Sequence, residues 1–505
     1  MNKTFANFFV FTTGAVIMAI ELTASRLLAP YFGSSIFVWG NVIGVVMITM
    51  AIGYWWGGRL ADKKPRIKTL AVLILSCGLF LSALPIFFRP LVTLIIGLLN
   101  YSSLVAFALI CFWVLLVILA FPMVILAMTS PFIIRLLNKQ LDTTGRVAGG
   151  VFAAGTVGSI FGVFMATFIT VPFLGSLETI LICSAALIML AGLSFRSKYK
   201  MLALLVFLPM MVYLGVGSRP ISNLDGLIYE KETPYQYLRV VDAGGWRFLQ
   251  FNEGAAVQSY INFNSPHFLT GGSYYDYFNL LPRLSGKEND EKTFLIIGGG
   301  GGVAAKQLVS YWRPDISIDL VEIDREVIDV AQRFFNMTEN QIHVYNQDGR
   351  QFLNQIDKQY DYIIVDAYSN QLFIPFQLTT DEFFQLAESK LRAGGVLAIN
   401  VNADGFDSDL LQRIAQTIKK NFAQVAVLSL ENCYNHLVFA SNRPMRFDFN
   451  DDALDADLKQ LAEKFNDVKI IQDSKKEMIL TDNRAPIEYM TDKMVLKLFL
   501  EYVMN

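Results

Sequence analysis

The chain has 505 residues, of which 53% are hydrophobic and only 17% charged, and its mean hydropathy is +0.41. Soluble globular proteins carry about 25% charged residues, so this composition excludes a purely soluble protein, and it excludes a largely disordered one as well. Residues 1–217 contain 14 Lys and Arg against 4 Asp and Glu, a balance of +10, whereas residues 218–505 contain 28 against 40, a balance of −12. We infer an apolar half with basic connectors and an acidic soluble half, with no nucleic-acid partner.

The first half contains seven apolar runs whose lengths approach or exceed the roughly 20 residues that a membrane-spanning helix needs. They cover residues 7–29, 36–57, 68–88, 104–130, 148–172, 176–195 and 200–217. The stretch from 91 to 137 is long enough for two short spans, or for a re-entrant piece plus one span. We therefore expect residues 1–217 to form a helical transmembrane bundle of seven or eight spans that contacts a lipid bilayer.

Basic residues gather in alternate connectors of this bundle, after the second, fourth and sixth runs. By the positive-inside rule these connectors and the N-terminus are cytoplasmic. Seven crossings would then leave the second half of the chain outside. Eight would return it to the cytoplasm but would put one basic connector on the wrong side, so the sequence leaves the side of this half open. In the fifth run small residues recur at every fourth position, which predicts close helix packing, within the bundle or between subunits. They are Gly150, Ala154, Gly158, Gly162 and Ala166.

The second half has the pattern of a two-part soluble domain. Residues 226–263 alternate apolar and polar side chains between turn signals, which predicts a small β-hairpin region within residues 218–285. From 286 to 505, strand and helix patterns alternate, which predicts a doubly wound α/β domain, Rossmann-like and of the methyltransferase type. The expected strands are 293–297, 316–321, 342–345, 361–365 and 395–401, with a closing hairpin at 424–430 and 435–441, and the expected helices are 303–312, 325–336, 379–392, 453–466 and 490–504.

Side chains that commonly bind metals are scattered along the chain. The four cysteines form no CxxC pair, and the three histidines form no cluster. The sequence therefore predicts neither a disulfide framework nor a metal site.

A glycine run and three acidic residues stand at the ends of successive strands of the predicted sheet. They are Gly298, Gly299, Gly300 and Gly301 after the first strand, and Glu322, Asp348 and Asp366 after the second, third and fourth. Glycines at a strand-to-helix turn let the backbone approach a ligand, and acidic side chains at the next strand ends hold ribose hydroxyls. Because these strand ends share one edge of the sheet, the ordered set predicts a nucleoside site.

Each acidic residue also has a structural interpretation. Asp324 and Asp348 precede expected helices, where a carboxylate caps the first turn. For Asp324 we favour the cap, and for Asp348 we favour ligand binding. Asp366 ends a wholly apolar strand, where a carboxylate is costly unless it has a partner or a task, so we expect it to be functional.

These motifs together resemble the spermidine synthase family, the polyamine aminopropyltransferases, and in particular its membrane-fused members. The segments YQYLRV, EGAAVQS and YYDYFNLLP are similar to the hairpin region of the family, and GGGGG, VEID, QDG and VDAYSN follow in family order. The segments ELTASRLLAPYFGSS and TDNRAPIEY are similar to the fused forms. The soluble resemblance covers about residues 226–445.

The resemblance implies a reaction in which decarboxylated S-adenosylmethionine, a co-substrate, donates an aminopropyl group to putrescine, with no further cofactor. It makes Asp366 the base that orients the amine. It assigns donor contacts to Gln258, the glycine loop Gly298–Gly301, Glu322, Asp348 and Gly349, and acceptor contacts to Tyr274, Asp276, Asp366 and Tyr434. The resemblance also suggests a homodimer. We expect a multi-pass protein of the bacterial inner membrane, and because adenosyl donors are made in the cytosol we expect its soluble domain to face the cytoplasm.

Two positions depart from the family pattern. Gly301 stands where the family has an aspartate that pairs with the aminopropyl tail of the donor, and Ser369 stands where it has a second acceptor-side acid. Fewer carboxylates would weaken the capture of a diamine, so other acids must act or the substrate differs. Because the carboxylate is missing at Gly301, a methyltransferase that uses S-adenosylmethionine is an alternative function. Because the chain has a membrane bundle, a non-catalytic polyamine transporter or sensor is another alternative.

Overall fold

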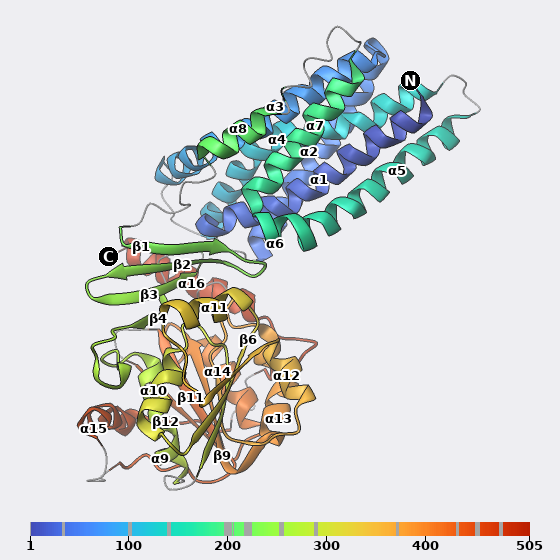
Figure 1. Cartoon of the computed structure of the whole chain (residues 1–505). Coiled ribbons are helices and arrows are strands. Elements are labelled where there is room, and N and C mark those ends of the chain that lie inside the picture. Colours follow the sequence, from blue (N-terminus) through green and yellow to red (C-terminus); the bar gives the residue numbers. More distant parts are fainter. Residues whose placement is uncertain are drawn as a thin grey trace. The chain divides into compact units, whose positions relative to one another are not determined.

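The computed structural model describes most of the chain in two compact units. The described residues are 2–32, 36–98, 104–138, 143–195, 205, 207–216, 225–251, 257–286, 291–369, 373–430, 434–449, 455–473 and 478–504. One unit comprises Met1–Ile221 with Glu232–Pro234, and the other comprises Ser222–Lys231 with Tyr235–Asn505. Each unit is described by itself below (Figure 1).

The first unit is a helical bundle. Within the described part of the chain, six helices are long and apolar enough to cross a membrane, in agreement with the first six predicted runs. They are α1 (Lys3–Phe32), α2 (Ile36–Lys63), α3 (Ile67–Leu98), α4 (Leu104–Leu137), α5 (Thr144–Met165), which continues through a π-helical turn (Ala166–Thr170) into α6 (Val171–Leu174), and α7 (Ser176–Ser194). Of the seventh run, only α8 (Phe207–Val216) is described as helix, and the remainder lies outside the described residues.

The small-residue stripe of α5 brings its backbone against α1. A Cβ atom built on Gly158 would lie 2.0 Å from the carbonyl oxygen of Phe11, and one on Gly162 would lie 2.1 Å from that of Ala15. Any larger side chain at either position would therefore push the two helices apart. For these two glycines, packing inside the bundle is the interpretation that the structure supports.

The second unit begins with a four-stranded antiparallel sheet, as the hairpin pattern predicts. Its strands lie in the order β1-β2-β3-β4. They are β1 (Leu227–Glu232), β2 (Tyr237–Ala243), β3 (Trp246–Phe251) and β4 (Val257–Ile261).

An eight-stranded sheet follows, in the order β12-β10-β11-β9-β8-β5-β6-β7. Neighbouring strands from β9 to β7 pair in parallel, whereas β10, β11 and β12 pair antiparallel. The strands are β5 (Lys292–Ile297), β6 (Ile316–Glu322), β7 (Ile342–Asn346), β8 (Tyr360–Val365), β9 (Leu391–Asn402), β10 (Gln424–Ser429), β11 (Asn435–Ser441) and β12 (Lys469–Ile470). The predicted Rossmann-like sheet with a closing hairpin is confirmed.

Helices cover both faces of this sheet (Figure 1). Successive side chains of a strand point to opposite faces, so in β8 Tyr362 and Ile364 join one apolar core while Ile363 and Val365 join the other. The first core includes side chains of α10 (Val303–Trp312), α11 (Arg325–Phe334) and α15 (Ala456–Glu463), and the second those of α12 (Gly349–Gln355), α13 (Asp381–Ser389), α14 (Asp409–Lys419) and α16 (Ile487–Met504).

Two helices, α12 and α14, are absent from the sequence-based expectations. The signal for α14 is present, because Leu410, Ile414 and Ile418 recur every fourth residue and all three are buried. The helix α12 has only seven residues, too few for a periodic pattern to stand out. Both helices matter for the site, because α12 begins beside Asp348 and α14 packs against α16.

Candidate active site

The site lies where the strand order of the sheet reverses. From β5 the chain continues to β6 and β7 on one side, and it then returns to β8 and β9 on the other. The carboxyl ends of strands at such a reversal are the usual ligand site of an open α/β sheet. Gly298 follows β5 at φ +98°, and a Cβ there would lie 2.4 Å from the carbonyl oxygen of Asp366. Only glycine allows the ends of β5 and β8 to come this close.

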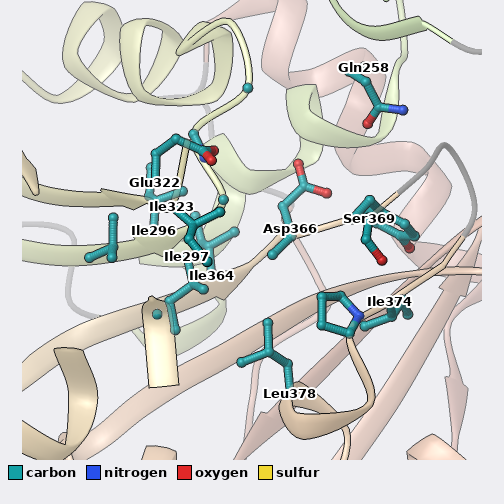
Figure 2. A pocket seen from close by; sticks show the side chains of 18 of the residues that line it. Gln258, Ile296, Ile297, Glu322, Ile323, Ile364, Asp366, Ser369, Ile374 and Leu378 are labelled. Atoms are coloured by element: carbon teal, nitrogen blue, oxygen red, sulfur yellow. The ribbon is translucent and has the colours of Figure 1, made fainter. Parts of the chain in front are cut away.

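A cavity of about 410 Å³ opens at this point, a volume suited to a nucleoside-sized ligand (Figure 2). Side chains of β5 and β8, together with Ile374 and Leu378, give it apolar walls. Its polar groups include Gln258 from β4, Tyr274, Glu322, Asp348, Asp366 and Ser369. In Figure 2, Glu322 lies on one side of Asp366 and Ser369 on the other.

Asp366 is held by two side chains from separate segments. The Tyr274 hydroxyl donates to its Oδ2 at 2.9 Å, and the Asn400 amide donates to its Oδ1 at 3.0 Å. The Asn400 amide is itself oriented, because its own oxygen accepts a hydrogen bond from Asn435 at 3.0 Å. Burial raises the pKa of Asp366 to about 7, while the two donors oppose this rise. The carboxyl is therefore poised to gain or lose a proton near neutral pH.

Glu322 joins the end of β6 to the glycine loop. Its Oε2 accepts the backbone N–H of Gly299 at 2.9 Å, and its Oε1 accepts that of Asp324 at 3.0 Å. Burial raises the pKa of Glu322, and the backbone donors partly oppose this rise. Two carboxylate oxygens offer about four acceptor positions, so lone pairs remain for ligand hydroxyls in the cavity.

Asp348 and Asp324 both cap helices. Asp348 Oδ1 accepts the backbone N–H of Gln351 at 2.9 Å at the start of α12, and Asp324 Oδ1 accepts that of Glu326 at 3.0 Å at the start of α11. For Asp324 the favoured structural interpretation is therefore supported. Asp348 lines the cavity as well as capping, so its two interpretations are compatible. Gly349 also lines the cavity, and a Cβ there would lie 2.3 Å from Ile297.

Two predicted acceptor contacts lie apart from the described cavity lining. Asp276 is fully buried and accepts hydrogen bonds from Thr270, Gly272 and Gln307. This geometry favours a structural task, the fixing of the loop before Tyr274. Tyr434, which directly precedes β11, is 52% exposed and is not among the described lining residues. Neither position has geometric support as an acceptor contact.

Gly301 is also not among the described residues that line the cavity. Its N–H donates to the Ser259 hydroxyl at 2.9 Å, and a Cβ there would lie 3.0 Å from both the Ser259 Cβ and the Phe335 ring. At this position the spermidine synthase family, which the sequence resembles, has an aspartate, but here there is little room for any side chain. Ser369 does line the cavity, but a hydroxyl carries no charge.

Two residues at the site escaped the sequence analysis. Asn400 lies on β9 and is 2% exposed, and its contact with Asp366 depends on strand pairing that no local motif reveals. Glu488 lines the cavity from the first turn of α16. It lies within the segment TDNRAPIEY, for which the sequence offers only a similarity to the membrane-fused members of the family and no predicted role.

The cavity is acidic. The carboxylates that line it are those of Glu322, Asp348, Asp366 and Glu488. Among the described lining residues there is no Lys, Arg or His. A cleft lined by one sign of charge concentrates ions of the opposite sign, so this site favours cationic ligands.

Comparison with known proteins agrees with these features. Residues 278–432 match the family model described as the spermine/spermidine synthase domain. A probable polyamine aminopropyl transferase of Bifidobacterium longum is 31% identical over 286 residues, which cover 52% of this chain and 61% of that protein. Polyamine aminopropyltransferase 2 of Aquifex aeolicus is 23% identical over 438 residues, covering 81% of this chain and 82% of that protein.

Among solved structures, a probable spermidine synthase from Corynebacterium glutamicum superposes with a TM-score of 0.42 at 16% identity, over 52% of this chain and 97% of that one. The chain spans about three fifths of the length of the first curated relatives that it matches. It therefore contains a spermine/spermidine synthase domain, is homologous to the polyamine aminopropyltransferases, and carries long apolar helices ahead of that domain.

Proposed function

We propose that this protein is a membrane-anchored polyamine aminopropyltransferase that transfers an aminopropyl group from decarboxylated S-adenosylmethionine to putrescine or a related amine. The observation that carries the proposal is Asp366. It is a carboxyl with a pKa of about 7, fixed by Tyr274 and Asn400, at the edge of an acidic nucleoside-sized cavity.

The donor would lie across the ends of β5, β6 and β7. The glycine loop would let its backbone approach the nucleoside, Glu322 would accept the ribose hydroxyls, and Asp348 would accept the adenine amino group. Ile323, which is 41% exposed and lines the cavity, offers an apolar surface to the base. Gln258 reaches the cavity from β4, on the side of the smaller sheet.

The chemical step is a displacement at carbon. The amine nitrogen of the acceptor forms a bond to the propyl carbon next to the sulfonium. The carbon–sulfur bond breaks, its electron pair stays on sulfur, and neutral methylthioadenosine leaves. In-line placement of nitrogen, carbon and sulfur supplies much of the rate enhancement, since it removes the entropy cost of the encounter.

Asp366 would serve the nucleophile. An aliphatic amine has a pKa of about 10.4, so at neutral pH it is mostly protonated and unreactive. A carboxylate can take up that proton or orient the neutral amine, and a base with a pKa near the working pH does this well. The hydrogen bonds from Tyr274 and Asn400 aim the carboxylate and keep enough of it ionised.

The test uses the full chain in detergent, with the Asp366→Asn variant. We expect kcat for methylthioadenosine release to fall by about a thousandfold, because the base is lost. The matched control is Asp473→Asn, since the Asp473 side chain is 89% exposed and should leave the rate unchanged. If wild-type protein released no methylthioadenosine with any amine, the proposal would be wrong.

A methyltransferase is the second candidate, and Gly301 is the observation that favours it. Without a carboxylate at this position, one means of rejecting the carboxylated donor S-adenosylmethionine is missing. Release of S-adenosylhomocysteine from S-adenosylmethionine would establish this alternative. Competition between the two donors in one reaction, with both nucleoside products quantified, decides between them.

We also propose that the soluble unit faces the cytoplasm. The proposal rests on donor supply, since adenosyl donors are made in the cytosol; within the described part of the chain the six candidate spans are an even number, which supports this side for a cytoplasmic N-terminus provided that the run 200–217 does not cross. Added protease should then spare the second unit in intact spheroplasts and digest it in inverted vesicles. The homodimer stays a prediction.

A further inference from the structure

Two consecutive residues ahead of Tyr274 adopt a strained backbone. His267 and Phe268 have φ angles of +50° and +60°, in the left-handed region that residues other than glycine seldom enter. Residues persist in this region only where their surroundings fix them, and they gather at functional sites. Further along the chain, at the start of the 3-10 helix Tyr274–Leu280, the Tyr274 hydroxyl reaches Asp366. The contacts that hold the strained turn therefore bear on the position of this hydroxyl.

Side chains of α10 hold the strained turn in place. The Gln307 amide donates to the backbone carbonyl of Phe268 at 3.0 Å. The Lys306 ammonium lies 4.6 Å from the centre of the Phe268 ring, which is a cation–π contact. The His267 ring stacks on Tyr311 with 4.2 Å between the ring centres. The conformation of the turn is thus imposed by one face of α10.

The same Gln307 amide fixes the segment between this turn and Tyr274. Its Nε2 also donates to Asp276 Oδ1 at 2.7 Å. The other oxygen of Asp276 accepts the backbone N–H groups of Thr270 and Gly272 at 3.1 and 2.9 Å. Gln307 and Asp276 are both fully buried, so water does not compete for these hydrogen bonds. Together they hold the backbone that leads from the strained turn to Tyr274.

Gln307 also bonds the helix that carries Tyr274. Its amide oxygen accepts a hydrogen bond from the Asn279 side chain at 3.1 Å, and Asn279 belongs to the 3-10 helix Tyr274–Leu280. One amide group therefore joins the strained turn, the Asp276 carboxylate and this helix. A hydrocarbon side chain at position 307 could form none of these bonds, and it would leave buried polar atoms unpaired.

We propose that Gln307 is a positioning residue for the reaction, which acts on Asp366 by holding Tyr274 in place. The inference rests on the proposed function, in which Asp366 serves the amine. Gln307 is not among the described residues that line the cavity, so it acts through other side chains. The Tyr274 hydroxyl favours the ionised form of Asp366 only while it stays at hydrogen-bond distance, which is 2.9 Å here.

The experiment measures the pKa of Asp366 on the full-length protein in detergent. The infrared C=O band of the protonated carboxyl reports this pKa, and the band is identified as the one that Asp366→Asn removes. The test variant is Gln307→Met, which keeps an unbranched side chain and removes the amide. The matched control is Gln416→Met on α14, because the Gln416 amide is also buried and donates to a backbone carbonyl, that of Gln472, at 2.7 Å.

Tyr274→Phe completes a double-mutant cycle, because it removes the hydroxyl through which Gln307 acts. We expect Tyr274→Phe to raise the pKa of Asp366 by about one unit and Gln307→Met to raise it by about half a unit, since a donor to the ionised form is lost or displaced. In the Tyr274→Phe background, Gln307→Met should add no further shift. Gln416→Met should leave the pKa at the wild-type value.

Turnover with putrescine is measured on the same samples, and the acid limb of kcat/KM should move with the infrared titration. If Gln307 were merely structural, Gln307→Met would lower kcat/KM by one factor at every pH and leave the pKa unchanged, which would overturn the inference. An equal shift with and without the Tyr274 hydroxyl would overturn it as well.

A second variant covers the case in which Gln307→Met does not fold. Gln307→Asn keeps an amide on a shorter side chain that cannot reach both Phe268 and Asp276, so the same shift and the same dependence on Tyr274 are expected. The proposed function is judged separately, by wild-type release of methylthioadenosine. If that release is absent, the proposed function is wrong, while the infrared titration still decides whether Gln307 acts on Asp366.

Discussion

The two ends of the cavity are built in different ways. At the donor end, the glycine loop, Glu322 and Asp348 stand at the ends of three consecutive strands, and backbone N–H groups hold both carboxylates. At the other end, which we propose for the acceptor, Tyr274 and Asn400 come from two segments far apart in the chain and meet at the Asp366 carboxylate. The donor end is thus a property of the fold, whereas the acceptor end is a property of particular side chains.

This difference shows where the protein can change its substrate. Replacing a donor-end residue disturbs loop geometry that every adenosyl ligand needs. Replacing an acceptor-end residue changes the charge or shape offered to one amine and leaves the sheet intact. Three further substitutions test whether the two ends are separable in this way.

The largest difference between the effects on the two ends of the cavity is expected for Glu322→Gln. The amide offers one acceptor oxygen in place of two, and its NH₂ group faces a backbone donor, so ribose contacts and the glycine loop are both disturbed. We expect methylthioadenosine to bind about 30-fold more weakly, in line with the loss of one or two charge-assisted hydrogen bonds. Calorimetry measures this, and the KM for putrescine at saturating donor should stay within twofold. A comparable rise in both constants would show that the ends are coupled.

A second test restores the missing acid of the glycine loop with Gly301→Asp. Because a Cβ at this position would lie 3.0 Å from Ser259 and from Phe335, we expect the substitution to destabilise the protein by about 1–3 kcal/mol. It should not improve selectivity for the decarboxylated donor. Thermal unfolding in detergent measures the first effect and donor competition the second. An undiminished melting temperature together with better donor selectivity would contradict the geometry described.

The third test concerns the boundary between the ends, where Asp366 titrates. Because the pKa of Asp366 is about 7, the ionised fraction of this carboxyl grows as the pH rises through neutrality. We therefore expect kcat/KM to rise with pH and to level off above neutrality. Asn400→Leu removes a donor that favours the ionised form, so the pKa rises and the acid limb moves to higher pH, by about half a unit to one unit. The pH profile of kcat/KM with putrescine measures the shift. A limb that stays in place would mean that another group titrates.

The sequence finds the residues that line the cavity at the ends of β5, β6 and β7, but it does not find the partners that hold Asp366, for a physical reason. Gly298, Glu322 and Asp348 are local features, since each follows an apolar strand and parallel strands must end at one edge. The predicted β-strands, the first six of the seven predicted apolar runs and the Asp324 cap rest on the same kind of local pattern. Asn400 carries no such signal, because its contact with Asp366 exists only once β9 pairs with β8.

Asp276 shows the reverse case. Its place in the family pattern indicates an acceptor contact, yet its oxygens are taken up by Thr270, Gly272 and Gln307 inside the domain. A motif position gives the residue type but not the direction of the side chain. The direction depends on which partner satisfies the buried carboxylate, and that is a tertiary property.

The acidic lining of the cavity also affects how a reaction cycle would end. The proposed transfer turns a sulfonium cation into a neutral thioether while both ligands are still bound. Four carboxylates without a basic residue among the described lining would attract the proposed donor through its positive charges, and would lose that attraction when the charge is transferred with the aminopropyl group. The nucleoside product would therefore be held more weakly than the donor, and the chemistry itself would help to empty the site.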